Sequence, residues 1–97
     1  MATFNEVKER YLEQLEMFVP IVQRVHGPHH PEFHEVKDLF DALNAKIKAA
    51  GGERPDLDEE FAQLRAVTDN YRVPDDVCET YEAVYKMLEE LDKAYGN

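Results

Sequence analysis

The 97-residue sequence has no tryptophan, a single cysteine and few basic residues. One cysteine, Cys78, cannot form a disulfide within the chain, which indicates a reducing compartment. Only 11 Lys and Arg stand against 21 Asp and Glu, so the formal net charge is -10. This charge repels the phosphates of nucleic acids and the head groups of anionic lipids. We therefore expect no nucleic-acid partner and no binding to a membrane surface.

Long apolar segments are missing as well. No run approaches the roughly 18 apolar residues that a membrane-spanning helix requires. Residues 1–6 read MATFNE and lack the basic and apolar regions of a signal peptide. The sequence therefore predicts a cytoplasmic location.

The chain does contain enough apolar side chains for one core. Hydrophobic residues make up 43% of it, including five Tyr and five Phe, and they are spread too evenly for a disordered segment. Ninety-seven residues lie near the lower limit at which a domain folds without disulfides or metals. Residues 1–97 are therefore predicted to form a single domain.

Apolar residues recur at alternating steps of three and four along four segments, which predicts four amphipathic helices. Short loops between them favour antiparallel neighbours, so the predicted fold class is all-α, an up-down-up-down four-helix bundle. The inward stripes are expected to be Phe4, Val7, Tyr11, Leu15, Phe18, Val22 and Val25; Phe33, Val36, Phe40, Leu43 and Ile47; Leu57, Phe61, Leu64, Thr68 and Tyr71; and Val77, Tyr81, Val84, Leu88, Leu91 and Tyr95.

Helix boundaries follow from prolines, glycines and capping residues. Pro20 lies inside the first helix and should bend it, because proline removes one backbone hydrogen bond. Pro31 should occupy the first position of the second helix, and Gly51-Gly52 should end that helix. Asp56, three residues before Glu59, should open the third helix as a variant of the capping box.

All four histidines lie in residues 26–35, between the first two predicted helices. His30 and His34 are four residues apart, a spacing that places two imidazoles on one helical face and permits chelation of a divalent metal. A metal site here would consist of His26, His29, His30, His34 and Glu35 and would hold iron or zinc. The simpler interpretation is that Pro31 fixes a turn, His30 caps the second helix and the other histidines are solvated, with no cofactor.

The same turn resembles a known family. Residues 22–27 (VQRVHG) and 30–33 (HPEF) are similar to the "ARVHG..HPEL" turn of the hemerythrin-like (HHE) di-iron proteins, which repair iron-sulfur clusters damaged by nitric oxide or peroxide. Residues 64–71 (LRAVTDNY) and 74–91 (PDDVCETYEAVYKMLEEL) resemble the family's "LRxLTNDYxxPxxACxTyxxLYxxLxxL" run. The resemblance covers nearly the whole chain apart from residues 51–55, and it implies a hemerythrin-like bundle.

The resemblance also implies iron ligands that this sequence lacks. The family's ligand histidine on the first helix falls at or near Asn5, and its His-x-x-x-Glu pair on the second helix corresponds to residues 50–54 (AGGER). The His-Asp pair that opens the family's next helix falls close to residues 54–55. The family's last helix continues past residues 95–97 into a further His-x-x-x-Glu pair.

Of the motif histidines, only His26 remains, with His30 beside it. A di-iron bundle needs several inward histidines and carboxylates at one level, whereas the inward stripes here are apolar, with Thr68 as the conspicuous polar member. A buried ligand without its metal costs roughly 1 to 3 kcal/mol, so a metal-free descendant should replace such ligands with hydrophobic residues. We expect this chain to be that descendant, with no cofactor.

These patterns predict a non-catalytic interaction or accessory module in iron handling or in the nitrosative or oxidative stress response. Its partner would be another protein or a second copy of the chain. No nucleophile-base pair, phosphate-binding loop or pair of inward carboxylates supports an enzyme. The alternative function is a metal-binding protein that uses the histidine turn.

The sequence does not decide the role of Cys78 or of three apolar residues outside the main stripes. Cys78 lies near the start of the fourth helix, where the helix dipole favours a thiolate, but a small half-buried residue is the simpler interpretation. Leu12, Val19 and Leu39 lie beyond the main stripes, and they either widen the core or form a dimer face.

Overall fold

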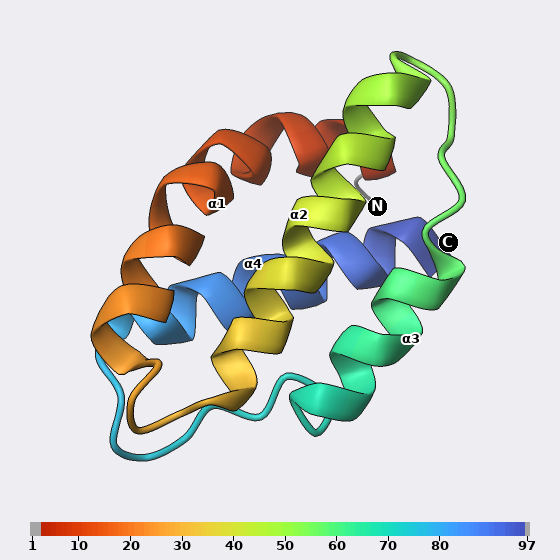
Figure 1. The fold of residues 1–97 in the computed structure, drawn as a ribbon. Helices are drawn as coiled ribbons and strands as arrows, with labels where there is room; N and C mark the ends of the chain where they lie inside the picture. The colour runs from red at the N-terminus through yellow and green to blue at the C-terminus, as the bar shows by residue number, and fades with distance from the viewer. Residues whose placement is uncertain (1–2, 97) are drawn as a thin grey trace.

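The computed structural model describes residues 3–96, which form four α-helices and contain no strand (Figure 1). The prediction of an all-α domain is confirmed. Residues 1, 2 and 97 lie outside the described part. They belong to the predicted domain 1–97, and residues 1 and 2 also belong to the segment MATFNE. The helices are α1 (Phe4–His26), α2 (Glu32–Ala50), α3 (Asp58–Val67) and α4 (Glu79–Gly96).

Helix α1 packs against both α2 and α4, and α2 also packs against α3. In Figure 1, α2 runs opposite to α1, and α3 runs opposite to α2, while α4 crosses behind α2. None of the described helices combines the length and the apolar character that crossing a bilayer demands.

The core is one continuous cluster to which every helix contributes. All five residues predicted to face inward from α2 are buried, because nothing interrupts the three-four spacing along that helix. Aromatic rings connect α4 to its neighbours: Phe33 lies 5.1 Å from Tyr81, and Phe61 lies 5.3 Å from Tyr95, measured between ring centroids. Each fully buried large side chain stabilises the fold by roughly 1.5 to 3 kcal/mol.

The predicted stripe of α1 is wrong at its end. Val25 is 56% exposed, whereas Val19 is fully buried and continues the stripe between Leu15 and Val22. At 3.6 residues per turn, Val25 points about 80° away from Leu15, and His26 lies closer to that direction. Val19, whose role the sequence did not decide, is therefore a core residue. Leu12 and Leu39, which were also undecided, are partly buried and pack against the core.

The predicted start of the third helix also needs correction. The capping box of the structure is at α1, where the Glu6 amide donates to Thr3 Oγ1 (3.2 Å) and the Thr3 amide donates to Glu6 Oε1 (3.3 Å). The capping box predicted at Asp56 is absent, since the cap of α3 is Leu57 without a side-chain hydrogen bond. Asp56 instead accepts from the amide of Asp58 in a local turn.

Proline and glycine mark the ends of α2. Pro31 is the residue before the helix rather than its first helical residue. Gly51 ends the helix with a φ of 62°, a conformation that glycine adopts without steric cost. The predicted end of α2 is confirmed.

Helix α3 is shorter than predicted, because Val67 is its last residue and Thr68 follows as the cap. Asp69, Asn70 and Tyr71 have φ values of 53°, 59° and 63°, so the chain turns through three left-handed residues. Tyr71 is buried as expected, but it lies beyond the helix. Helix α4 likewise begins two residues later than Val77, the first residue of its predicted stripe.

Candidate functional site at the histidine turn

The turn between α1 and α2 is too tight for a side chain at Gly27. A Cβ atom at this position would lie 2.4 Å from the Gln23 carbonyl oxygen and 2.9 Å from the His34 ring. The Gly27 amide donates to that same Gln23 carbonyl (2.9 Å), and the His30 amide donates to the His26 carbonyl (2.8 Å). Glycine is required here because a Cβ atom would clash with the backbone of α1 itself and with the His34 ring of α2, not because of a positive φ.

His26, at the end of α1, contacts the cysteine of the chain. Its Nε2 lies 3.2 Å from Cys78 Sγ, and its ring meets Tyr81 edge-on at 5.4 Å. Cys78 is exposed, so the half-buried interpretation of this residue is wrong. Its carbonyl accepts from the Glu82 amide (3.2 Å) in the first turn of α4, which keeps the thiol at the helix start. Reactivity of the thiol stays a prediction.

His30 and His34 do not share a helical face, because His30 precedes α2. The Nε2 of His30 lies 2.9 Å from Asp76 Oδ1, and its Nδ1 lies 3.4 Å from Glu32 Oε2. The Nδ1 of His34 lies 2.9 Å from Gln23 Nε2 on α1. The imidazoles of His30 and His34 therefore contact different partner residues.

The remaining members of the predicted metal set, His29 and Glu35, are exposed. In residues 3–96, no group of three or more His, Cys, Asp or Glu side chains lies close enough together to hold a metal ion. Binding of iron or zinc by His26, His29, His30, His34 and Glu35 would require the turn to rearrange. That alternative stays a prediction.

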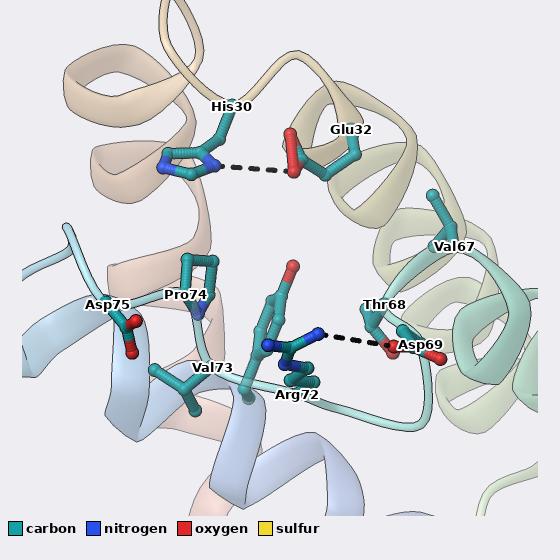
Figure 2. Close-up of a pocket in the computed structure, with 10 residues that line it drawn as sticks. His30, Glu32, Val67, Thr68, Asp69, Arg72, Val73, Pro74 and Asp75 are labelled. Carbon is teal, nitrogen blue, oxygen red and sulfur yellow. Dashed lines mark hydrogen bonds and ion pairs between the residues drawn. The ribbon is translucent and has the colours of Figure 1, made fainter.

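A pocket of about 350 Å³ opens beside His30. It lies between parts that are far apart in the sequence: the histidine turn with the start of α2, and residues 67–75 at the end of α3 and in the connection to α4, together with Tyr85 of α4. In Figure 2, His30 and Glu32 lie on one side of it, and Arg72 lies across from them. Its lining residues are His30, Glu32, Val67, Thr68, Asp69, Arg72, Val73, Pro74, Asp75 and Tyr85.

Tyr85 gives this pocket a buried polar group. Its side chain is 1% exposed, and its hydroxyl lies 2.9 Å from the hydroxyl of Tyr81. Burial, aided by the hydrogen bond to Tyr81, raises the pKa of Tyr85 far above its usual range, and burial also raises the pKa of Tyr81. Both tyrosines are therefore neutral near pH 7. Phe33 stacks on Tyr85 with ring planes 6° apart and holds the ring in place.

Asp69, which lines the pocket, is the first residue of the left-handed turn of residues 69–71. A non-glycine residue in this conformation costs roughly 1 to 3 kcal/mol, so neighbouring contacts must hold it. Thr68 Oγ1 donates to the Leu64 carbonyl (2.6 Å) and accepts from the Tyr71 amide (2.8 Å). The Tyr71 hydroxyl donates to Asp92 on α4 (2.8 Å), and burial raises the pKa of Tyr71.

Sequence reasoning did not find this pocket. Two weak signals were present: Thr68 was the polar member of an apolar stripe, and Asp69-Asn70 are residues that tolerate a left-handed conformation. Neither signal shows that the turn comes next to His30, because that proximity depends on how α2 and α3 pack.

Comparison with known proteins gives one distant relative. The chain is 24% identical, in an alignment that spans 121 residues, to the iron-sulfur cluster repair protein ScdA of Staphylococcus haemolyticus (strain JCSC1435). The alignment covers 93% of this chain and 54% of that protein. The chain thus spans about half the length of this relative. No family model matches the chain, and no solved structure matches it. The similarity supports a distant relationship to ScdA.

The residues of the bundle interior do not fit the di-iron centre that the sequence resemblance implies. Among the described residues, the buried polar or charged side chains are Glu60 and Thr68. Glu60 pairs through Oε2 with Lys46 Nζ at 2.7 Å, and Thr68 is engaged by the backbone as described above. Asp92 on α4, whose side chain is 12% exposed, accepts from Arg65 and from the Tyr71 hydroxyl, and none of the histidines in residues 3–96 is fully buried. The donor set for two irons is missing.

Proposed function

We propose that this chain is a hemerythrin-like bundle without a di-iron centre, and that it acts as a non-catalytic accessory or interaction module in a stress-response system related to iron-sulfur cluster repair. The observation that carries the proposal is the apolar interior: where a di-iron bundle needs converging histidines and carboxylates, buried aliphatic and aromatic side chains are packed. The distant similarity to ScdA supports the link to repair.

An exposed apolar row on α1 supports the interaction role. Met17, Ile21 and Val25 are 60%, 39% and 56% exposed, and they follow one another at steps of four residues. Residues at this spacing lie along one ridge of a helix, the kind of ridge that packs into the groove of another helix. We infer that this row, Met17-Ile21-Val25, contacts a protein partner.

The test is quantitative capture of partner proteins by the wild type and by two variants that add the same charge. Ile21→Glu places a carboxylate in the middle of the Met17-Ile21-Val25 row, and Ala42→Glu places one on an exposed position of α2. The proposal expects a specific partner that binds the wild type and Ala42→Glu but is lost with Ile21→Glu. Equal capture by all three proteins, or no specific partner together with tight metal binding, would count against it.

A further inference from the structure

We propose that the Met17-Ile21-Val25 row binds a second copy of this chain, with the two α1 helices antiparallel about a two-fold axis at Ile21. This inference rests on the proposed interaction role of the row and names the occupant of that surface. The exposure of the row and the distribution of charge along α1 carry it.

The row lies in a part of the chain that has no carboxylates. Residues 17–31 read MFVPIVQRVHGPHHP and contain no Asp or Glu, although the whole chain has 21 of them. Two copies that each carry a net charge of -10 repel one another over most of their surfaces. All large apolar side chains that are exposed in residues 3–96 belong to this row. The apolar surface therefore coincides with the segment where two acidic copies repel each other least.

The sign of the charge changes along α1. Residues 4–16 contain four Glu against one Lys and one Arg, whereas Arg24 is the single Lys or Arg of residues 17–31. Arg24 and Glu13 are both exposed. The ion pairs of residues 3–96 use seven other Lys and Arg side chains, and neither Arg24 nor Glu13 takes part in one. Both charges are available to a neighbouring molecule.

The positions of Glu13 and Arg24 suit an antiparallel pair of helices. At 3.6 residues per turn they lie on the same edge of the row, about 80° and 60° around the helix from Ile21. Glu13 precedes Ile21 by eight residues, and Arg24 follows it by three.

A two-fold axis at Ile21 keeps both residues on that edge and reverses their order in the second copy. Glu13 of one copy then lies about 7.5 Å farther along the helix than Arg24 of the other, an offset that a long arginine side chain spans. Met17 of each copy faces Val25 of the other. A parallel pair would instead place each charge beside its own equivalent, so the charges favour the antiparallel arrangement.

The contact is expected to be weak, because one helical row buries less surface than a stable interface needs. We expect a reversible dimer with a dissociation constant on the order of 10 to 100 µM. The test is sedimentation equilibrium of the untagged full chain at physiological salt, up to a concentration of about 0.5 mM. The apparent mass should rise with concentration toward twice the 11.3 kDa of one chain.

Ile21→Glu places two carboxylates together at the axis and should weaken association at least about a hundredfold. Ala42→Glu is the matched control, since it adds the same charge at an exposed position of α2 and should leave association unchanged. Every position substituted in these tests is exposed, so the variants are expected to fold, which circular dichroism checks.

Charge reversal separates a specific contact from an effect of net charge. Glu13→Arg makes the chain less acidic, so a net-charge effect would strengthen association. The proposal expects the opposite, a weakening of about tenfold, because two arginines then face each other on each edge. Arg24→Glu should weaken association similarly. An equimolar mixture of these two variants should restore it, because each edge contact of the mixed pair joins an arginine to a glutamate.

A chain that stays monomeric, a dimer that survives Ile21→Glu, or a dimer strengthened by Glu13→Arg would overturn the proposal. A mixture of the two reversed variants that associates no better than either alone would also overturn it. A monomeric chain whose row captures a different protein would reject the second copy as occupant but leave the interaction role in place. A monomeric chain that captures no protein would reject both.

Discussion

The two ends of the bundle differ in how deeply the polar contacts between their segments are buried (Figure 1). At the end where α1 begins and α4 ends, the Tyr95 hydroxyl accepts from the Leu57 amide (2.8 Å) in a buried hydrogen bond, and Arg54 donates to the Tyr95 carbonyl (2.7 Å). Arg54 also lies over the Tyr95 ring at 4.2 Å, and Phe4 meets the ring edge-on at 5.6 Å. At the histidine-turn end the contacts between distant segments are exposed: His30 Nε2 lies 2.9 Å from Asp76 Oδ1, and His26 Nε2 lies 3.2 Å from Cys78 Sγ.

This difference predicts that the Tyr95 end contributes more to stability than the histidine-turn end. The Tyr95 end fixes the loop before α3 to the last turn of α4 through one buried and one part-buried hydrogen bond. The histidine-turn end is held by exposed contacts, and the left-handed residues 69–71 lie between α3 and α4. Substitutions at the two ends should therefore differ in how much they destabilise the fold.

The largest effect is expected at Tyr95. Tyr95→Ala removes a ring that contacts Phe4, Phe61 and Arg54, and the loss should destabilise the fold by about 3 to 5 kcal/mol. Chemical denaturation followed by circular dichroism measures this change. Tyr95→Phe keeps the ring but leaves the buried Leu57 amide without its acceptor, so it should cost less, about 1 to 3 kcal/mol. Equal losses for the two variants would show that the ring contacts contribute little.

A smaller effect is expected at Thr68, which holds the left-handed turn at the pocket rim. Thr68→Val keeps the shape of the side chain but leaves the Tyr71 amide without an acceptor, at a cost of about 1 to 3 kcal/mol. Chemical denaturation measures this cost, which should be smaller than that of Tyr95→Ala. A loss as large as that of Tyr95→Ala would show that the turn contributes as much to stability as the Tyr95 ring.

The smallest effect is expected at the first turn of α1. Hydrogen bonds from Thr3 lower the pKa of Glu6 below its ordinary value of 4.5. A carboxyl group with a lowered pKa in the folded state stabilises the protein above the unfolded pKa, and this contribution is lost as the pH falls through the folded pKa. The stability difference between wild type and Thr3→Ala should therefore be small at neutral pH and smaller still in acid. A difference that grows below the pKa of Glu6 would contradict this interpretation.

The sequence predicted the parts of the fold that depend on local periodicity. The stripe of α2 is right at every position, because no proline or glycine interrupts it. The stripe of α1 fails at Val25, where alternating steps of three and four drift away from 3.6 residues per turn. The predicted end of α3 is wrong after Val67: the Thr68 amide still donates to the Leu64 carbonyl, but the Tyr71 amide donates to the Thr68 hydroxyl instead of a helical carbonyl.

The candidate site was harder to predict than the fold. The spacing of His30 and His34 predicts a shared helical face only if His30 lies on a helix. His30 precedes α2, however, and contacts Asp76 from a distant part of the sequence. The pocket depends on the packing of α2 against α3 and on a left-handed turn, neither of which follows from the order of residue types. The exposure of Cys78 next to His26 also comes from tertiary packing.

The central claim is that the bundle interior has replaced metal ligands with hydrophobic side chains. Its most direct test is the iron content and visible absorption spectrum of untagged protein, with thermal melting before and after addition of ferrous iron. We predict a colourless protein with substoichiometric iron and an unchanged melting temperature. A coloured protein that contains a pair of irons per chain would contradict the claim.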